Sequence, residues 1–271
     1  MTVRDVGRTL GGLLLDLDGV FFVGDDAVPG GAETVEWAAK SGVPYLFVTN
    51  TTSYPRARLA DKLAGFGIRA TPDQILTPAV AARALLEDTE PGPVALYVPA
   101  QTAEEFAGLT VLDPGDRSDA GAVVVGDLGE AWDFTRLNAA FRQLSARPAP
   151  LLVALGMTRF WQGSDGRNLD VGPFVAALEF ATGVAPVVTG KPAAAFFEAA
   201  AHRLGVPADQ LAMVGDDIRG DVEGAQRAGM SGVLVRTGKF HPSDLDAGIT
   251  PHATLGSIAD LSAWWEGRAD D

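Results

Sequence analysis

The chain has 271 residues, of which 47% are apolar and 21% charged, a composition typical of a globular protein with room for about two folding units. Its 21 basic and 35 acidic side chains give a formal net charge of −14, which would repel nucleic acid and anionic membrane surfaces. Cysteine is absent, which excludes disulfides, zinc fingers, iron–sulfur clusters and thiol nucleophiles.

The first residues lack the basic region and apolar core of a signal peptide, since the first apolar run is cut by Asp16. The apolar runs elsewhere are strand-sized and fall short of the 18 or more residues that a membrane-spanning helix needs. We therefore expect a cytoplasmic protein with neither nucleic acid nor membrane as a partner.

Four short apolar runs end abruptly in polar residues or glycine, at 13–15, 45–48, 211–214 and 233–235. Continuous apolar runs are typical of strands covered on both faces, and the segments between them favour helices. Helices are predicted over 33–40 and 56–65, and over 193–204, where Pro192 and Gly205 mark the start and stop. The pattern predicts an α/β fold with a parallel sheet.

The middle of the chain repeats the alternation of strands and helices. Apolar runs occupy 94–98, 122–125 and 151–155, a helical spacing covers 134–144, and Pro173 can open another helix that runs to about Ala181. We interpret 81–183 as a second α/β unit, inserted into a first unit made of 1–80 and 184–271. No low-complexity linker separates them, and 90–93 is interpreted as a turn or hinge.

The residues that follow the strands form one coherent set, because ligands of an open parallel sheet bind beyond the carboxyl ends of its strands. The first strand is followed by Asp16 and Asp18, the second by Thr49 and Asn50. The later members of the set are Lys191, Asp216, Asp217 and Asp221.

Asp16 and Asp18 lie two residues apart, so their carboxylates point to one side of an extended chain, and Asp216 would crowd a third charge beside them. Such a cluster is tolerable only when it is protonated or balanced by a cation. Oxygen ligands without cysteine favour a hard ion, Mg²⁺ first, and Lys191 supplies a second positive charge. A carboxylate not used as a metal ligand can attack phosphorus, and a neighbouring acid can serve as general acid and base.

These residues carry a family resemblance. The segments around Asp16 to Val20, Val48 to Asn50, Gly190 to Pro192 and Gly215 to Asp221 resemble the four ordered motifs of haloacid-dehalogenase (HAD) superfamily phosphatases. The inserted region falls where the subgroup with a large α/β cap (type C2, subclass IIA) carries that cap. Within the subgroup, residues 169–173, 214–218 and 235–240 resemble the phospholysine/phosphohistidine/inorganic pyrophosphate phosphatase group.

The resemblance implies a Rossmann-like core and a Mg²⁺-dependent phosphohydrolase acting on small phosphorylated molecules, including phosphoramidates or pyrophosphate. It implies Asp16 as the nucleophile that forms an aspartyl phosphate and Asp18 as the general acid and base. The other implied roles are these: phosphate or substrate contacts for Thr49 and Asn50, a charge anchor for Lys191, metal ligation by Asp16, the backbone carbonyl of Asp18 and Asp216, and an outer-shell position for Asp217 and Asp221.

The inserted unit offers Arg159 and Trp161 as residues that could contact the leaving group and set specificity. They flank residues 163–166, which are interpreted either as a specificity loop or as a solvated hairpin turn beside a packed tryptophan. The resemblance also implies self-association as a homodimer through the cap.

Other interpretations of the same residues stay open at this level. Asp16 to Gly19 alone could be a solvated turn or a calcium loop, and Gly215 to Asp217 a turn. Thr49 could cap a helix and Asn50 occupy a turn. The alternative functions are a metal-dependent scaffold or regulatory protein with vestigial activity, and a dehalogenase-type hydrolase that needs neither Asp18 nor a metal.

Overall fold

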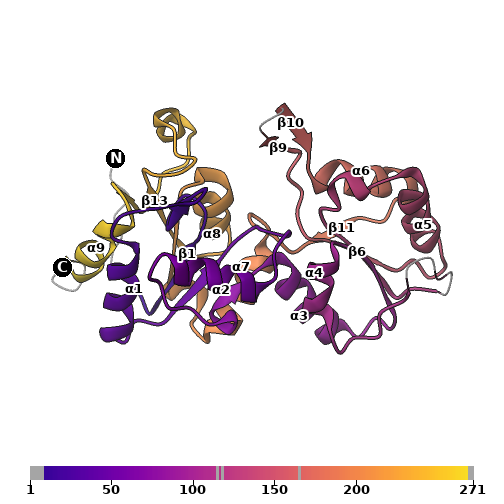
Figure 1. The fold of residues 1–271 in the computed structure, drawn as a ribbon, viewed down its shortest axis with the longest axis horizontal. Coiled ribbons are helices and arrows are strands. Elements are labelled where there is room, and N and C mark those ends of the chain that lie inside the picture. Colours follow the sequence, from indigo (N-terminus) through magenta and orange to yellow (C-terminus); the bar gives the residue numbers. More distant parts are fainter. Residues whose placement is uncertain (1–8, 114–115, 117–118, 164–165, 268–271) are drawn as a thin grey trace. The chain divides into compact units, whose positions relative to one another are not determined.

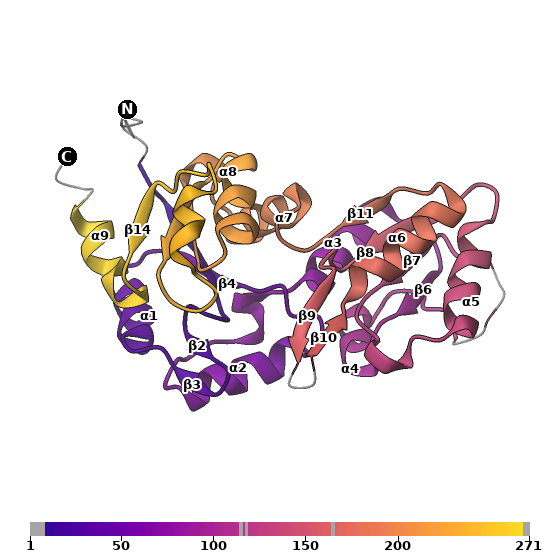
Figure 2. The same ribbon diagram turned by 90° about the horizontal axis from the view of Figure 1, so that it is seen from above.

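The computed structural model describes residues 9–113, 116, 119–163 and 166–267. The chain divides into two compact units. Unit 1 contains residues 1–49, 56–76 and 191–271, and unit 2 contains 50–55 and 77–190. In Figures 1 and 2 the indigo start and the yellow end of the chain therefore belong to one unit, and the magenta middle belongs to the other.

Unit 1 is built on a six-stranded parallel sheet in the order β14-β13-β12-β1-β4-β5. β1 lies inside this sheet between β12 and β4, so its Leu13 to Leu15 run is fully buried. A small antiparallel pair, β2 and β3, follows β1. The strand bounds are β1 Gly12–Asp16, β2 Phe22–Val23, β3 Asp26–Ala27, β4 Tyr45–Val48, β5 Ile75–Leu76, β12 Leu211–Gly215, β13 Ser231–Val235 and β14 Ala253–Leu255.

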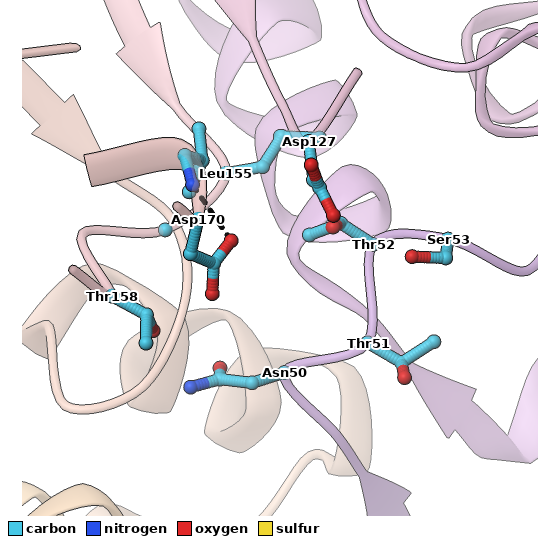
Figure 3. A pocket seen from close by; sticks show the side chains of 10 residues that line it. Asn50, Thr51, Thr52, Ser53, Asp127, Leu155, Thr158 and Asp170 are labelled. Carbon is cyan, nitrogen blue, oxygen red and sulfur yellow. Dashed lines mark hydrogen bonds between the residues drawn. The ribbon is translucent and has the colours of Figure 1, made fainter. Parts of the chain in front are cut away.

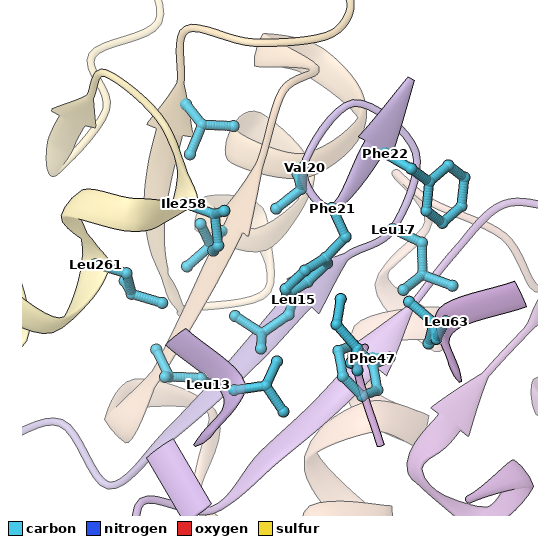
Figure 4. Close-up of a cluster of buried hydrophobic side chains, with 14 of the residues drawn as sticks. Leu13, Leu15, Leu17, Val20, Phe21, Phe22, Phe47, Leu63, Ile258 and Leu261 are labelled. Atoms are coloured by element: carbon cyan, nitrogen blue, oxygen red, sulfur yellow. The ribbon is translucent and has the colours of Figure 1, made fainter. Parts of the chain in front are cut away.

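Helices connect the strands of unit 1 and cover its sheet. One apolar cluster joins Leu13, Leu15 and Phe47 of the sheet to Leu63 of α2 and Leu261 of α9 (Figure 4). The helices are α1 Gly31–Lys40, α2 Arg56–Gly65, α7 Ala194–Leu204, α8 Gly224–Arg227 and α9 Leu261–Gly267, with short helical turns η1 Pro72–Gln74, η4 Ala208–Gln210, η5 Ile218–Glu223, η6 Pro242–Asp246 and η7 Ile258–Asp260.

Unit 2 has its own four-stranded parallel sheet in the order β11-β8-β7-β6. Alternate residues of β7 face opposite sides: Val123 and Val125 pack in the cluster with α5 and α6, whereas Val124 packs in the cluster with α3. Cover on both faces explains why this strand is apolar at every position. The strands are β6 Val94–Tyr97, β7 Ala122–Val125, β8 Leu151–Ala154 and β11 Pro186–Val188, with an antiparallel hairpin of β9 Phe160–Gly163 and β10 Gly166–Leu169.

The helices of unit 2 begin at clear capping signals. Thr77 accepts a hydrogen bond from the backbone of Val80 at the start of α3, and Asp133 accepts one from Arg136 at the start of α5. Gly183, in the left-handed region, ends α6. The helices are α3 Pro78–Thr89, α4 Ala100–Ala103, α5 Phe134–Leu144 and α6 Val171–Thr182, with turns η2 Glu104–Phe106 and η3 Gly129–Ala131.

The α/β fold class and the predicted strands and helices of both units are confirmed. The division of the chain differs in detail from the predicted one, because unit 2 runs from 77 to 190 rather than from 81 to 183 and also takes in residues 50–55. Within the described residues, none of the helices is long and apolar enough to cross a membrane.

Candidate active site

The centre of the candidate site lies where the central strands of unit 1 end. Asp16 is the last residue of β1 and pairs in register with Val48 of β4. Thr49 follows β4, and Asp216 follows β12 on the other side of β1. Because the strands are parallel, their carboxyl ends meet at one edge of the sheet, as the sequence predicts.

Lys191 joins two of the acidic residues. Its Nζ lies 2.7 Å from Oδ1 of Asp16 and 2.7 Å from Oδ1 of Asp221. The three side chains are 4%, 7% and 1% exposed, so these ion pairs are almost shielded from water. In the chain, Lys191 lies directly before Pro192 and three residues before α7.

Asp216 completes a group of three carboxylates. One oxygen each from Asp16, Asp216 and Asp221 lies within 4.8 Å of the others. Oδ2 of Asp216 accepts a hydrogen bond from the backbone N–H of Lys239 at 2.6 Å, whereas its buried Oδ1 has no hydrogen-bond partner among the described residues. A buried carboxylate oxygen without a partner is costly, and a hard cation is the ligand that would satisfy it. The donor set therefore fits a divalent metal ion.

The charges of the cluster do not balance by themselves. When all three carboxylates are ionised, the buried ammonium group of Lys191 balances only one of them, and the other nearby cation, Lys239, has a side chain that is 69% exposed. Burial raises the pKa of Asp16, although Lys191 opposes the change. Burial likewise raises the pKa of Asp216 to about 6 and that of Asp221 to about 7, and the charge of Asp16 adds to the effect on Asp221.

The pKa of Lys191 is also raised, but for a different reason. Burial alone would lower the pKa of its ammonium group, but the adjacent carboxylates of Asp16 and Asp221 outweigh burial and hold that pKa above its usual value. The lysine is therefore a fixed positive charge in this site.

Asp217 and Asp221 flank and belong to the same turn, η5, but their carboxylates make different contacts. The carboxylate of Asp217 caps η5 by accepting hydrogen bonds from the backbones of Arg219 and Gly220 at 3.0 and 2.8 Å. The backbone N–H of Asp217 donates to Oδ2 of Asp221 at 3.1 Å. The turn thus directs Asp221 into the carboxylate group, whereas the sequence interpretation places both residues in an outer shell.

The remaining predicted residues of this site have distinct surroundings. Asp18 is exposed, two residues beyond Asp16, and forms an isolated bridge with Phe22. Thr49 is buried, and its backbone N–H donates to the carbonyl of Leu76 at 3.1 Å. Asn50 is exposed and belongs to unit 2. The structure therefore brings Asp16, Lys191, Asp216 and Asp221 into one cluster.

Unit 2 contains a polar cavity of about 300 Å³. Its lining includes Asn50, three hydroxyl residues (Thr51, Thr52 and Ser53), Thr158, Asp127 and Asp170. Figure 3 shows the carboxylate of Asp170 directed towards the space between Thr158 and Asn50. Asp170 also caps α6 by accepting a hydrogen bond from Val171 at 2.7 Å, and burial, with Asp127 nearby, raises its pKa.

The predicted specificity residues, Arg159 and Trp161, follow closely in the chain after Thr158, which lines this cavity. Arg159 is exposed and directly precedes β9, and the backbone of Trp161 lies in β9, while its side chain lies outside the described residues. The hairpin interpretation of 163–166 agrees with the pairing of Gly163 with Gly166, and the two residues between them also lie outside the described part. The cavity was not predicted from the sequence, although Asp127, two residues after the apolar strand β7, was a usable signal.

Two family models match the chain. One, described as haloacid dehalogenase-like hydrolase, matches residues 13–110, and the other, described as HAD-hydrolase-like, matches residues 188–261. The first range contains Asp16 and Thr49, and the second contains Lys191, Asp216 and Asp221. The two models together span the whole carboxylate cluster.

The sequence is also similar to whole proteins. It is 38% identical over 237 residues to human phospholysine phosphohistidine inorganic pyrophosphate phosphatase, covering 86% of this chain and 85% of the human protein. It is 39% identical over 239 residues to haloacid dehalogenase-like hydrolase domain-containing protein 2 of Bos taurus, covering 88% and 89%.

Among solved structures, the p-nitrophenyl phosphatase from Archaeoglobus fulgidus has a TM-score of 0.85 at 28% identity, covering 94% of this chain and 99% of that one. The 4-nitrophenylphosphatase from Thermotoga maritima has a TM-score of 0.83 at 26% identity, covering 94% and 97%. The likeness therefore spans both units of the fold.

Proposed function

Because the chain belongs to the haloacid dehalogenase-like hydrolases and is a phosphatase, we propose that it hydrolyses small phosphorylated molecules with Mg²⁺ through a phosphorylated Asp16. The family resemblance of the four motifs is confirmed. The single observation that carries the proposal is the buried contact of Lys191 with Asp16 and Asp221 beside Asp216, at the carboxyl ends of the strands.

In the first step, a carboxylate oxygen of Asp16 attacks phosphorus, and the bond from phosphorus to the leaving oxygen or nitrogen breaks. The exposed side chain of Asp18, two residues further on, donates a proton to the leaving group. Lys191 lies 2.7 Å from Asp16, where its fixed charge favours the ionised form of the nucleophile and offsets charge on the phosphoryl oxygens.

In the second step, Asp18 removes a proton from water, which attacks phosphorus and releases phosphate with the carboxylate of Asp16 regenerated. Splitting hydrolysis in this way replaces one difficult displacement by two easier ones. The residues that would hold Mg²⁺ are Asp16, the backbone carbonyl of Asp18 and Asp216, with Asp221 beside them, and the bound ion would neutralise phosphoryl charge. Asp217 would act from further out by organising the turn.

The substrate is proposed to be a small molecule. Thr49 and Asn50 are assigned to phosphate or substrate contacts, and Arg159 and Trp161 of unit 2 to contacts with the leaving group. Similar proteins are named for phospholysine, phosphohistidine, pyrophosphate and p-nitrophenyl phosphate. Phosphoramidates and pyrophosphate therefore belong in the substrate panel beside phosphate esters.

We also propose that the protein pairs with a second copy through unit 2. Phe134 of α5 and Phe180 of α6 are 81% and 93% exposed, an unusual position for large aromatic side chains. α5 and α6 contact each other, so the two rings belong to one helix pair. The measurement is the molar mass in solution: parent dimers that become monomers in Phe180→Ser support the pairing, and a monomeric parent contradicts it.

The catalytic proposal is tested by release of inorganic phosphate from p-nitrophenyl phosphate with Mg²⁺ and with a chelator. Asp16→Asn is expected to lower kcat by at least about 1,000-fold, because it removes the nucleophile. The exposed Asp26→Asn in β3 is the matched control and is expected to keep full activity.

Two results would defeat the catalytic proposal. Unchanged activity of Asp16→Asn would remove the nucleophile assignment, and chelator-insensitive turnover of haloacids would favour the dehalogenase-type alternative. Complete inactivity of the parent over a broad panel of phosphate compounds would favour the metal-dependent scaffold.

A further inference from the structure

The segment Thr237 to Lys239, which follows β13, meets the turn after β1 at the side chain of Asp216. The backbone N–H of Lys239 donates to Oδ2 of Asp216 at 2.6 Å. The hydroxyl of Thr237 donates to the backbone carbonyl of Gly19 at 2.5 Å. Two stretches of chain more than 200 residues apart are thus tied together at one carboxylate.

Two glycines form the wall against which that carboxylate rests. Gly19 and Gly238 have φ angles of 82° and 60°, which other residues rarely adopt. A Cβ at Gly238 would lie 2.1 Å from Oδ2 of Asp216 and 2.3 Å from the Cα of Gly19. A Cβ at Gly19 would lie 1.8 Å from the same oxygen. Only glycine at both positions allows this close approach of the backbones to Asp216.

The two carboxylate oxygens of Asp216 therefore have different surroundings. Oδ2 is held by the Lys239 backbone and enclosed by the two glycines, while the buried Oδ1 has no hydrogen-bond partner in the described part of the chain. The side chain of Lys239 is 69% exposed, so it is the backbone of this residue that holds the carboxylate.

We infer that Thr237 and Gly238, together with Gly19, are positioning residues that fix the rotamer of Asp216 and keep Oδ1 available to a divalent cation. The inference rests on the proposed function, in which Asp216 is a metal ligand. Groups that orient a metal ligand commonly contribute 10- to 100-fold in metal affinity. An orientation set before binding spares the cation the cost of ordering the side chain.

The experiment measures Mg²⁺ affinity by titration calorimetry on the full-length, metal-free protein. Gly238→Ala is expected to weaken binding by about 10-fold or more, since its methyl group displaces Asp216. The matched control is Gly24→Ala, because Gly24 has a nearly identical φ of 62° but no atom within 4 Å of an added Cβ. The control is expected to bind Mg²⁺ as the parent does.

A second pair of variants keeps the test valid should Gly238→Ala fail to fold. Thr237→Val removes the hydroxyl at nearly constant shape and is expected to weaken Mg²⁺ binding by about 10-fold. Thr237→Ser retains the hydroxyl and is expected to bind Mg²⁺ with the affinity of the parent. In phosphatase assays, Thr237→Val is expected to raise the Mg²⁺ concentration needed for half activity while KM at saturating Mg²⁺ stays constant. A general packing defect would not follow the hydroxyl in this way.

The Asp216→Asn variant distinguishes a failure of the metal assignment of Asp216 from a failure of the positioning role of Thr237 and Gly238. A parent that binds no Mg²⁺, or an Asp216→Asn variant that binds it as the parent does, contradicts the metal assignment of the proposed function. Loss of binding in Asp216→Asn, with parental affinity in folded Gly238→Ala and in Thr237→Val, overturns the positioning role alone.

Discussion

Units 1 and 2 are both parallel α/β structures, yet they place different chemistry at the ends of their strands. In unit 1 the strands lead into Asp16, Thr49 and Asp216. In unit 2, β6 leads into Val98 and β8 into Leu155, while β7 is followed by Gly126 and then by Asp127, which lines the polar cavity. The described part of unit 2 also contains a half-buried aromatic stack, in which Trp132 lies between Tyr97 and Phe174 at centroid distances of 6.0 and 4.8 Å.

The comparison shows that the sheet architecture supplies a location and not a function. What distinguishes unit 1 is the residue type at each of these strand ends and the burial of opposite charges there. What holds unit 2 together is apolar and aromatic contact. Each prediction below changes one side of this contrast and leaves the other as an internal reference.

The largest effect on stability is expected from Lys191→Met. Removing the ammonium group leaves Asp16 and Asp221 buried without a counter-charge, which should cost about 3 kcal/mol in the free energy of unfolding of the metal-free protein. Urea unfolding at neutral pH measures it. Lys40→Ala, which breaks an exposed contact with Glu36, is the control and should leave the transition midpoint in place. Equal urea midpoints for Lys191→Met and Lys40→Ala would contradict the stabilisation of the site by the buried ion pairs of Lys191.

A smaller and regional effect is expected from Mg²⁺. At a concentration 100 times its Kd, a ligand that binds only the folded state adds about 2.7 kcal/mol. Amide hydrogen exchange should show this gain in β1 and β12, which hold Asp16 and precede Asp216, and little of it in β7 of unit 2. Equal slowing in both units would mean that the ion does not act at the carboxylate cluster alone.

The reverse experiment perturbs unit 2. Trp132→Leu removes the middle ring of the aromatic stack and should lower the stability of that unit by about 2 kcal/mol, because ring contacts and apolar burial are both lost. Exchange rates of the β7 amides report the change, and those of β1 should stay constant. Met157→Leu, at a 39% exposed side chain of unit 2, is the comparison variant and should leave the β7 exchange rates unchanged. Faster exchange in β1 would show that the units are not energetically separate.

The smallest effect concerns pH. Burial raises the pKa of Tyr97 to about 12, whereas an unfolded tyrosine ionises near 10. The unfolded state therefore loses its proton first, so the contribution of this group to stability is complete below about pH 10 and declines as the pH rises to 12. Absorbance at 295 nm should show a step near pH 12 that Tyr97→Phe removes. If the step persists in Tyr97→Phe, a tyrosine other than Tyr97 is responsible for it.

The strands and helices with long apolar runs were predictable from sequence, because cover on both faces leaves a continuous signal. Short strands such as β5 and β14 were not, since two or three residues carry too little pattern. The pairing of β2 with β3 was also missed, because it follows directly on the acidic turn.

Within the site, the strand-end residues Asp16 and Asp216 were predictable from their position after apolar runs. The contact of Asp221 with Lys191 was not, because it depends on the η5 turn that Asp217 caps. The approach of Gly238 to Gly19 was equally hidden, since it joins residues that only the completed sheet brings together. Long-range closure of this kind leaves no local trace in a sequence.

The pairing of β1 with β12 has a consequence for synthesis. Leu13 takes its place opposite Ala212, so the ribosome must make the whole of unit 2 before β1 acquires that neighbour. β6, β7, β8 and β11 are complete by then, and the middle unit can fold on the nascent chain while β1, one of the most apolar strands of the protein, has β4 on one side but still lacks its neighbour on the other. Translation speed and chaperone access over this interval should therefore bear mainly on the yield of unit 1.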